Sequence, residues 1–237
     1  MNSDQRPDGA DGGALRALFA AIVARDLIEI TGQLRSAPDL ATRRLDDADG
    51  YFLAAIHHHI GGGDTALHVA AAAHTPEVAE LLVAQGAQVR ARNRRGAEPL
   101  HYAADGRPGD PTWDPAGQRD VIALLIRAGA FPDALNKSGV APLHRAVRTR
   151  SSSGVGALIA NGADPRMRNK SGSTPLHLAV QNTGKSDSGS DAAKHEQRLI
   201  IALLLQSGAS PTDVDATGKT VAAAATGDRI RELLHNG

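Results

Sequence analysis

Histidine is the residue in this sequence with the most obvious chemical potential, because an imidazole can bind a metal or carry a proton near neutral pH. Four histidines stand in the same local pattern, His68, His101, His144 and His177. If the pattern marks stacked layers about 10 Å apart, the four rings cannot converge on one ion, which needs N–metal distances of about 2 Å. We therefore predict that these side chains hold backbone groups by hydrogen bonds.

The run His57-His58-His59 is a different candidate. Three adjacent side chains cannot all face one way on a strand or a helix, although two of them can. A zinc or nickel site in this run, with His74 nearby in the sequence, is therefore an alternative hypothesis. A solvated or repeat-capping run is our main expectation, and we predict no bound metal or cofactor.

Other motifs for chemistry are incomplete. Gly184-Lys185-Ser186 and Gly218-Lys219-Thr220 resemble the end of a phosphate-binding loop, but the glycine required five positions earlier is replaced by Ala179 and Asp213. The sequence contains no cysteine nucleophile, no serine between the glycines of a nucleophile elbow, and no paired histidines of a zinc protease helix. It therefore predicts a protein that is not an enzyme.

The four histidines belong to a turn that leads into a helix. In residues 172–179, with the sequence GSTPLHLA, Gly172 suits a positive φ, Thr174 suits the N-cap and Pro175 suits the first helical position. The pattern begins at Gly63, Gly96, Gly139 and Gly172, with a degenerate copy at Gly218. A second marker, Gly-Ala, precedes each later copy by ten residues and suits a helix C-terminus.

A period of 33 residues with the pattern T-P-L-H-x-A resembles the ankyrin repeat family. The copies depart from it where Glu98 or Ala141 replaces the threonine, and where Ala66 replaces the proline. The resemblance implies an all-α ankyrin-repeat solenoid of stacked helix pairs with short β-hairpin fingers. We expect a disordered tail (1–13), an N-terminal helical capping unit (14–62), four repeats (63–95, 96–138, 139–171 and 172–217) and a C-terminal capping repeat (218–237).

Helical periodicity places the individual elements. An inner helix should begin at each pattern, and outer helices are expected at 78–85, 119–127, 155–161 and 198–207, with a last helix at 229–234. The capping unit should hold helices at 14–24 and 26–34 and a short one at 38–45, followed by a hairpin finger over 57–63. Two repeats exceed the period, and their inserts, around 105–115 and 182–191, are expected as loops between inner and outer helices. The single tryptophan, Trp113, either folds back over the outer helices or is an exposed anchor for a partner.

Composition narrows the class further. Hydrophobic residues make up 41% but aromatic residues only 3%, which suits thin layers packed through Ala, Leu, Val and Ile. The formal net charge of zero argues against bulk nucleic-acid binding. The polar start of the chain lacks the apolar region of a secretory signal, and no apolar run is long enough to span a bilayer. The absence of cysteine fits a reducing cytosol, so we predict a cytoplasmic protein. We also predict that it is a monomer and does not contact membranes.

The finger segments carry a local charge excess. The windows 87–97, 130–140, 163–173 and 209–219 contain nine basic and four acidic residues. The resemblance implies that finger tips and inner helices contact a protein partner, here Arg92, Arg94, Arg95, Ala97, Lys137, Ser138, Arg148, Thr149, Arg168, Lys170, Gln181 and Asn182. An acidic or phosphorylated segment is the hypothetical ligand. Charged fingers that only maintain solubility remain an alternative, as does weak nucleic-acid binding, although aromatic residues for base stacking are lacking.

Overall fold

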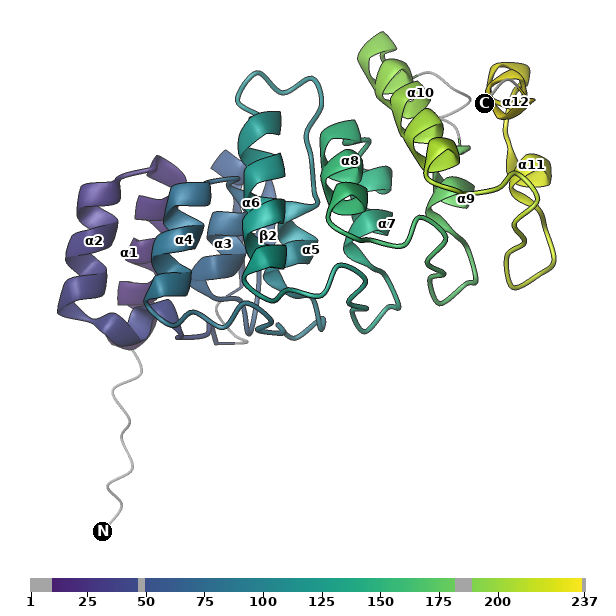
Figure 1. Ribbon diagram of the computed structural model, residues 1–237. Helices are drawn as coiled ribbons and strands as arrows, with labels where there is room; N and C mark the ends of the chain where they lie inside the picture. The colour runs from purple at the N-terminus through teal and green to yellow at the C-terminus, as the bar shows by residue number, and fades with distance from the viewer. Residues whose placement is uncertain (1–9, 47–49, 182–188, 236–237) are drawn as a thin grey trace.

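The computed structural model describes residues 10–46, 50–181 and 189–235. These residues form an elongated stack of helix pairs, with turns and fingers along one edge (Figure 1). The inner helices are α3 (Ala66–Ala72), α5 (Pro99–Ala103), α7 (Pro142–Arg148), α9 (Pro175–Ala179) and α11 (Val221–Ala224). The outer helices are α4 (Pro76–Ala84), α6 (Pro115–Arg127), α8 (Ser152–Ala160), α10 (Asp191–Gln206) and α12 (Asp228–His235).

The N-terminal end is closed by α1 (Ala10–Ala24), α2 (Leu27–Ser36) and the 3₁₀ turn η1 (Pro38–Ala41). The helix α1 begins four residues before the predicted start, so part of the expected tail is helical, and residues 1–9 lie outside the described residues. Only a 3₁₀ turn replaces the helix predicted at 38–45. Leu18 and Phe19 of α1 are fully buried, because α1 packs against α3 of the first repeat.

Each repeat begins as the sequence pattern predicts. Gly63 has a φ of 82° and Gly172 a φ of 71°, values that favour glycine. Both are also closely packed: a Cβ on Gly63 would lie 2.9 Å from Asn93 Cα, and one on Gly172 would lie 2.4 Å from Ala216 N. The glycine therefore serves two needs at once, the turn itself and the close approach of the next finger.

The first insert is a loop over residues 105–114, as predicted. The outer helices beside the inserts begin earlier than predicted, since α6 begins at Pro115 rather than at 119 and α10 begins at Asp191 rather than at 198. These helices have 13 and 16 residues, whereas α4 and α8 have 9 each. In the first insert, Asp114 Oδ1 accepts hydrogen bonds from Ala116 N and Gly117 N at 2.9 Å each, which starts α6 early. Residues 182–188 of the second insert lie outside the described residues.

The finger that precedes the first repeat is much longer than the others. Its base keeps the usual geometry, since Leu45 N donates to Asp64 O at 2.8 Å and Gly63 N donates to Leu45 O at 2.7 Å. The next finger has only two residues between Asn93 and Gly96, whereas seventeen residues separate the equivalent Leu45 and Gly63. Residues 46–62 contain strands β1 (Tyr51–Leu53) and β2 (His58–Ile60), joined through the 3₁₀ turn η3 (Ala54–Ile56).

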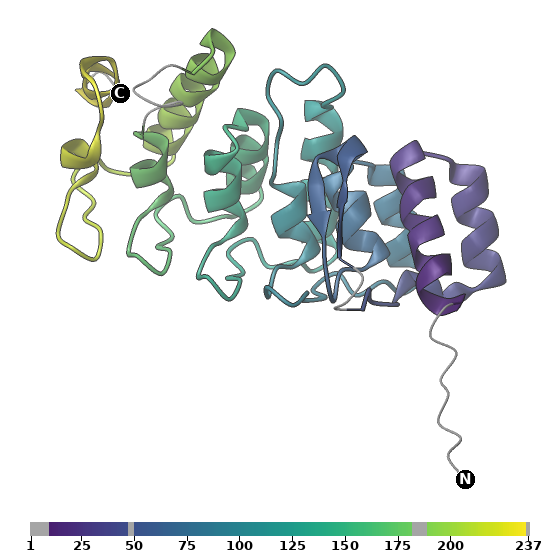
Figure 2. The ribbon, with the colours of Figure 1, turned by 180° about the vertical axis from the view of Figure 1, so that it is seen from behind.

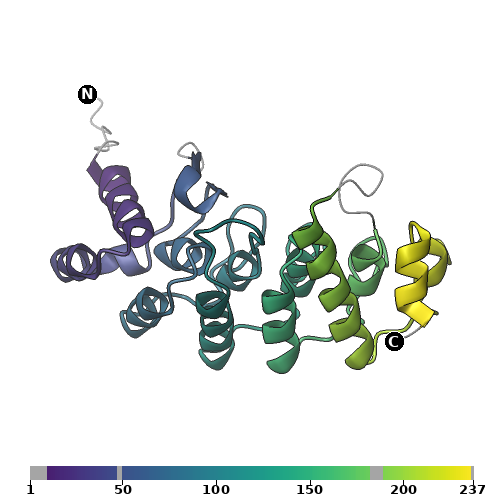
Figure 3. The ribbon, with the colours of Figure 1, turned by 90° about the horizontal axis from the view of Figure 1, so that it is seen from above.

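This hairpin rises on the side of the inner helices rather than at the finger edge. Figure 2 shows it standing in front of the inner helices, and Figure 3 shows it on the side opposite the outer helices. The prediction placed a hairpin finger over 57–63, whereas the paired strands span residues 51–60 and leave the finger edge altogether. The reason is its length, since seventeen residues (46–62) cannot close the tight turn that two residues close in the next finger.

The core runs continuously through the repeats. The leucine of the pattern is fully buried in each full repeat, at Leu67, Leu100, Leu143 and Leu176. The alanine of each Gly-Ala pair is buried as well, and its glycine has a positive φ. None of the described helices is both long and apolar enough to cross a membrane.

Candidate functional site

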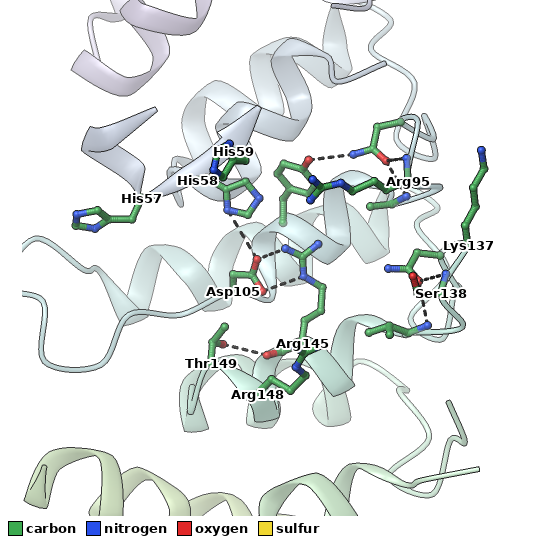
Figure 4. A pocket seen from close by; sticks show the side chains of 15 residues that line it. His57, His58, His59, Arg95, Asp105, Lys137, Ser138, Arg145, Arg148 and Thr149 are labelled. Atoms are coloured by element: carbon green, nitrogen blue, oxygen red, sulfur yellow. Dashed lines mark hydrogen bonds and ion pairs between the residues drawn. The ribbon is translucent and has the colours of Figure 1, made fainter. Parts of the chain in front are cut away.

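A groove of about 800 Å³ lies between the long hairpin and the fingers of the first two repeats. The hairpin contributes His57–His59, the fingers contribute Arg95, Lys137 and Ser138, and α7 contributes Arg145 and Arg148 (Figure 4). Tyr102, on α5, and Asp105, just after it, are also among the lining residues. The groove therefore joins residues from four consecutive units of the stack, the capping unit and the first three repeats.

The floor of the groove is built on Tyr102. The Arg145 guanidinium lies over its ring at 5.3 Å from the centroid, and the His58 ring is 4.2 Å away between centroids. Arg145 also binds Asp105 through two nitrogens, with Nε donating to Oδ1 at 2.9 Å. Burial raises the pKa of Asp105, while Arg145 opposes that change. The charge of Arg145 is therefore already compensated by a carboxylate.

His58 anchors the hairpin to this floor. Its Nδ1 lies 3.8 Å from Asp105 Oδ2, and only 14% of its side chain is exposed. Burial, assisted by the nearby Arg145 charge, lowers the pKa of His58 to about 4. The ring is therefore neutral at pH 7 and adds no charge to the groove.

A buried carboxylate holds the base of the hairpin. Asp64 has no exposed surface, and its two oxygens accept hydrogen bonds from Asn93 Nδ2 at 2.9 Å, Tyr102 Oη at 2.9 Å and Gly61 N at 2.7 Å. Burial and the adjacent carboxylate raise the pKa of Tyr102 above its usual value. The network connects hairpin, finger and inner helix, so the hairpin has a fixed position relative to the floor.

The four equivalent histidines have the structural role predicted for them. Each Nδ1 accepts a hydrogen bond from the backbone N–H three residues earlier, and each Nε2 contacts a carbonyl at the start of the next repeat at 3.0–3.2 Å. The Nε2 therefore carries the proton. Burial lowers the pKa of His101 to about 4 and also lowers the pKa values of His68 and His144. These rings join one repeat to the next.

The three hairpin histidines do not converge. His57 Nδ1 lies 3.4 Å from Asp110 Oδ2 and 3.1 Å from Arg107 Nη1, whereas His58 faces Tyr102 and His59 packs on Phe52. Within the described part of the chain, no three His, Cys, Asp or Glu side chains are grouped to hold a metal ion. The alternative of a metal site in this run therefore lacks the required geometry.

Comparison with known families matches ankyrin repeat profiles to three stretches of the chain. A three-copy profile matches residues 44–109, a many-copy profile matches 125–179, and a single-repeat profile matches 171–217. The chain belongs to the ankyrin repeat family. Ankyrin repeats generally mediate protein–protein interactions and are typically non-catalytic. No curated protein matches the sequence.

Two of the arginines that ankyrin geometry suggested for partner contact instead tie neighbouring fingers together. Arg92 Nε donates to Gly96 O at 3.1 Å, and its Nη2 reaches Leu135 O in the next finger. Arg168 Nη1 donates to Gly172 O at 3.0 Å and likewise reaches Val214 O. These side chains brace the ankyrin fingers, so their charges are only partly available to a partner.

The other basic side chains of the predicted contact surface and of the fingers fall into two groups, those in ion pairs and those without a partner. Arg90 and Arg166 form ion pairs, with Glu98 at 3.8 Å and with Asp213, respectively. By contrast, five of the cationic side chains predicted to contact a partner form neither hydrogen bonds nor ion pairs with the described residues: Arg94, Arg95, Lys137, Arg148 and Lys170. Three of these five line the groove, namely Arg95, Lys137 and Arg148.

The other predicted contact residues lie in several places. Ala97, Ser138 and Thr149 line the groove, and Thr149 Oγ1 accepts from Gly106 N at 3.1 Å. Lys170 and Gln181 belong to the third and fourth repeats, outside this groove. Asn182 lies outside the described residues.

Sequence reasoning missed Tyr102 and the wall formed by the long hairpin. Tyr102 occupies the variable position of T-P-L-H-x-A, where the other full repeats have Val69, Arg145 and Leu178, and that aromatic residue was the available signal.

Trp113 is half-buried, and a Cβ added to Gly106 would come 3.2 Å from its ring. It therefore packs within its own insert and is not a fully exposed anchor.

Proposed function

We propose that this ankyrin repeat protein is a non-catalytic interaction module that binds an acidic segment of a partner protein in the groove. The observation that carries the proposal is an imbalance of charge. Arg95, Lys137 and Arg148 are exposed and have no ion-pair partner among the described residues, whereas the carboxylates that line the groove with them are occupied. Asp105 is bound by Arg145, and Asp64 is buried and accepts hydrogen bonds from three donors.

An acidic segment would therefore meet positive charge that no hydrogen bond or ion pair within the described residues neutralises. Charge complementarity of this kind accelerates encounter and discriminates between partners. Neither His58 nor Asp105 opposes such a ligand, because the first is neutral and the second is paired. A basic partner is disfavoured, because it would bring like charges together.

The cations are carried on a braced edge. Lys137 N donates to Arg95 O at 3.0 Å, so the two finger tips are joined directly, and Arg92 adds a second link to Leu135. A preformed surface loses little conformational entropy on association, so more of the interaction energy appears as affinity. The protein is proposed to act as a monomer, and its cytoplasmic location stays a prediction.

A capture experiment with matched charge changes tests this proposal. The groove variant carries Arg95→Glu, Lys137→Glu and Arg148→Glu, and it spares Arg92 because that side chain braces the fingers. The control variant carries the same charge reversals at Arg35, Arg127 and Lys194, on helices α2, α6 and α10 away from the groove. Each tagged protein is incubated with lysate of the source cell, after circular dichroism has confirmed its fold.

The expected result is a protein that wild type and control variant retain and the groove variant loses. Its retention should fall when salt is raised, because screening weakens exposed charge interactions beyond about 10 Å at 0.1 M ionic strength. A partner that is retained equally by all three proteins would refute the groove as the binding site. Retention of nucleic acid, rather than protein, by the wild type alone would favour the other class of ligand.

A further inference from the structure

A second cavity continues the groove beneath the base of the hairpin. It has a volume of about 390 Å³ and shares His59, Asn93, Arg95 and Tyr102 with the first. Gly50 and Gly61 of the hairpin line one side, and Arg94 and Arg95 of the next finger line the other. Both cavities have volumes in the range of pockets that bind ligands. Together they form one path along the inside of the fingers.

Gly61 is unusual among the glycines of this region. Gly63, two residues later, needs its positive φ and has no room for a Cβ. Gly61 has neither constraint, since no left-handed φ occurs there and a Cβ would meet no heavy atom within 4 Å. The fold therefore does not explain the glycine. Bare backbone beside a cavity is typical of a place where another chain or a ligand approaches closely.

The charge of the second cavity matches that of the first. Arg94 and Arg95 are exposed and form no ion pair with the part of the chain that the structure describes. Asp64, the carboxylate among the lining residues, is fully buried and accepts hydrogen bonds from three donors. A chain that leaves the first cavity thus continues past Arg95 to Arg94. The unpaired cations Arg148, Lys137, Arg95 and Arg94 all lie along this path.

From this arrangement we infer that the ligand is a single extended acidic strand that occupies both cavities. Its carboxylates face the finger cations, and its backbone passes over Gly61 at the base of the hairpin. An extended strand turns alternate side chains to the same face, so its carboxylates can meet the finger cations while its backbone stays close to Gly61. This inference rests on the proposed function and adds the conformation and the course of the bound segment.

Binding of a synthetic strand tests the inference. The probe is a fluorescein-labelled peptide of about ten residues with glutamate at alternate positions, which spans about 33 Å when extended. Its affinity is measured by fluorescence anisotropy for wild type, for Gly61→Leu and for Arg94→Glu. Gly61→Leu fills the second cavity where the protein leaves open space, so the fold should be kept. Gly32→Leu is the control, because that exposed glycine on α2 also has nothing within 4 Å of its Cβ.

We expect Gly61→Leu and Arg94→Glu each to weaken binding by about tenfold or more, and Gly32→Leu to leave it unchanged. Equal affinity of wild type and both second-cavity variants, with loss only in the groove variant, would overturn the continuous path and leave the proposed function standing. Wild-type protein that does not bind the peptide would overturn both. A labelled single-stranded oligonucleotide, run in parallel, would identify nucleic acid as the ligand class if it alone bound.

Discussion

Replacing His101 with alanine should reveal how strongly the repeats are joined by their imidazoles. His101 Nδ1 accepts from Glu98 N at 3.1 Å, and its Nε2 lies 3.0 Å from Val140 O in the next repeat. The ring itself is fully buried. Removing it leaves the buried Glu98 N–H without a partner, which costs about 1–3 kcal/mol. Val140 O loses one of its two donors but still accepts from Asn136 N, and the missing ring leaves a cavity that adds to the cost. We expect the free energy of unfolding to fall by about 3 kcal/mol at pH 7.

The lowered pKa of His101 also predicts that the free energy of unfolding depends on pH. Burial, and to a smaller extent Arg145, lowers the pKa of His101 from 6.5 to about 4 in the folded protein. Between these values the unfolded chain binds a proton that the folded chain does not, so stability falls as the pH decreases. One pKa unit corresponds to 1.36 kcal/mol, so the wild type should lose about 2 kcal/mol through this group by about pH 5. His101→Ala cannot lose this contribution.

The difference in stability between the two proteins should therefore shrink as the solution is acidified. Urea unfolding followed by circular dichroism at about pH 7 and about pH 5 measures it directly. His195→Ala, at an exposed position of α10, is the control and should change stability by no more than about 0.5 kcal/mol. A loss below about 1 kcal/mol at pH 7, or a difference that stays the same at both pH values, would refute the reasoning.

Three further changes test other parts of the fold. Gly172→Ala should lower the free energy of unfolding, measured in urea, by more than about 2 kcal/mol, because its Cβ would lie 2.4 Å from Ala216 N. Gly86 has a similar φ but open space around a Cβ, so Gly86→Ala should cost only about 1 kcal/mol. Equal losses in the two variants would show that the close contact at Gly172 does not matter. Deleting residues 218–237 should lower the melting temperature in calorimetry by exposing the last full repeat, and an unchanged melting curve would show that this end is not a cap. Glu98→Thr should raise the melting temperature at neutral pH, because burial raises the pKa of Glu98 and its charged form therefore destabilises the folded protein. The gain should shrink in acid, where the carboxyl group is protonated and neutral. A gain that stays constant with pH would exclude burial of the charge as its cause.

The repeats could be predicted from the sequence because each one specifies its own start. The glycine turn, the capping residue, the proline and the histidine act within a few residues of one another, so their spacing is directly visible along the chain. The histidine assignment was confirmed for the same reason. The Nδ1 bond is local, and the Nε2 bond reaches the same position of the next repeat.

The candidate site could be predicted only in part. Arg92 and Arg95 look alike in the sequence, yet Arg92 braces a finger through Leu135 O, whereas Arg95 has no side-chain partner among the described residues and lines the groove. No local rule distinguishes them, because the acceptor of Arg92 lies in a different repeat. The predicted finger at 57–63 was wrong in position, since the paired strands within residues 51–60 leave the finger edge and His58 stands against Tyr102 instead.

The sequence alone determined the family, the stacked helix pairs and the basic character of the fingers. These features arise from short-range preferences that recur with a fixed period. The tertiary structure decided which of the charges remain free, and it placed the hairpin as the wall of a groove that continues beneath it. Those outcomes depend on side chains and carbonyls that are far apart in the chain, and only the stacking of the repeats brings them within hydrogen-bonding distance.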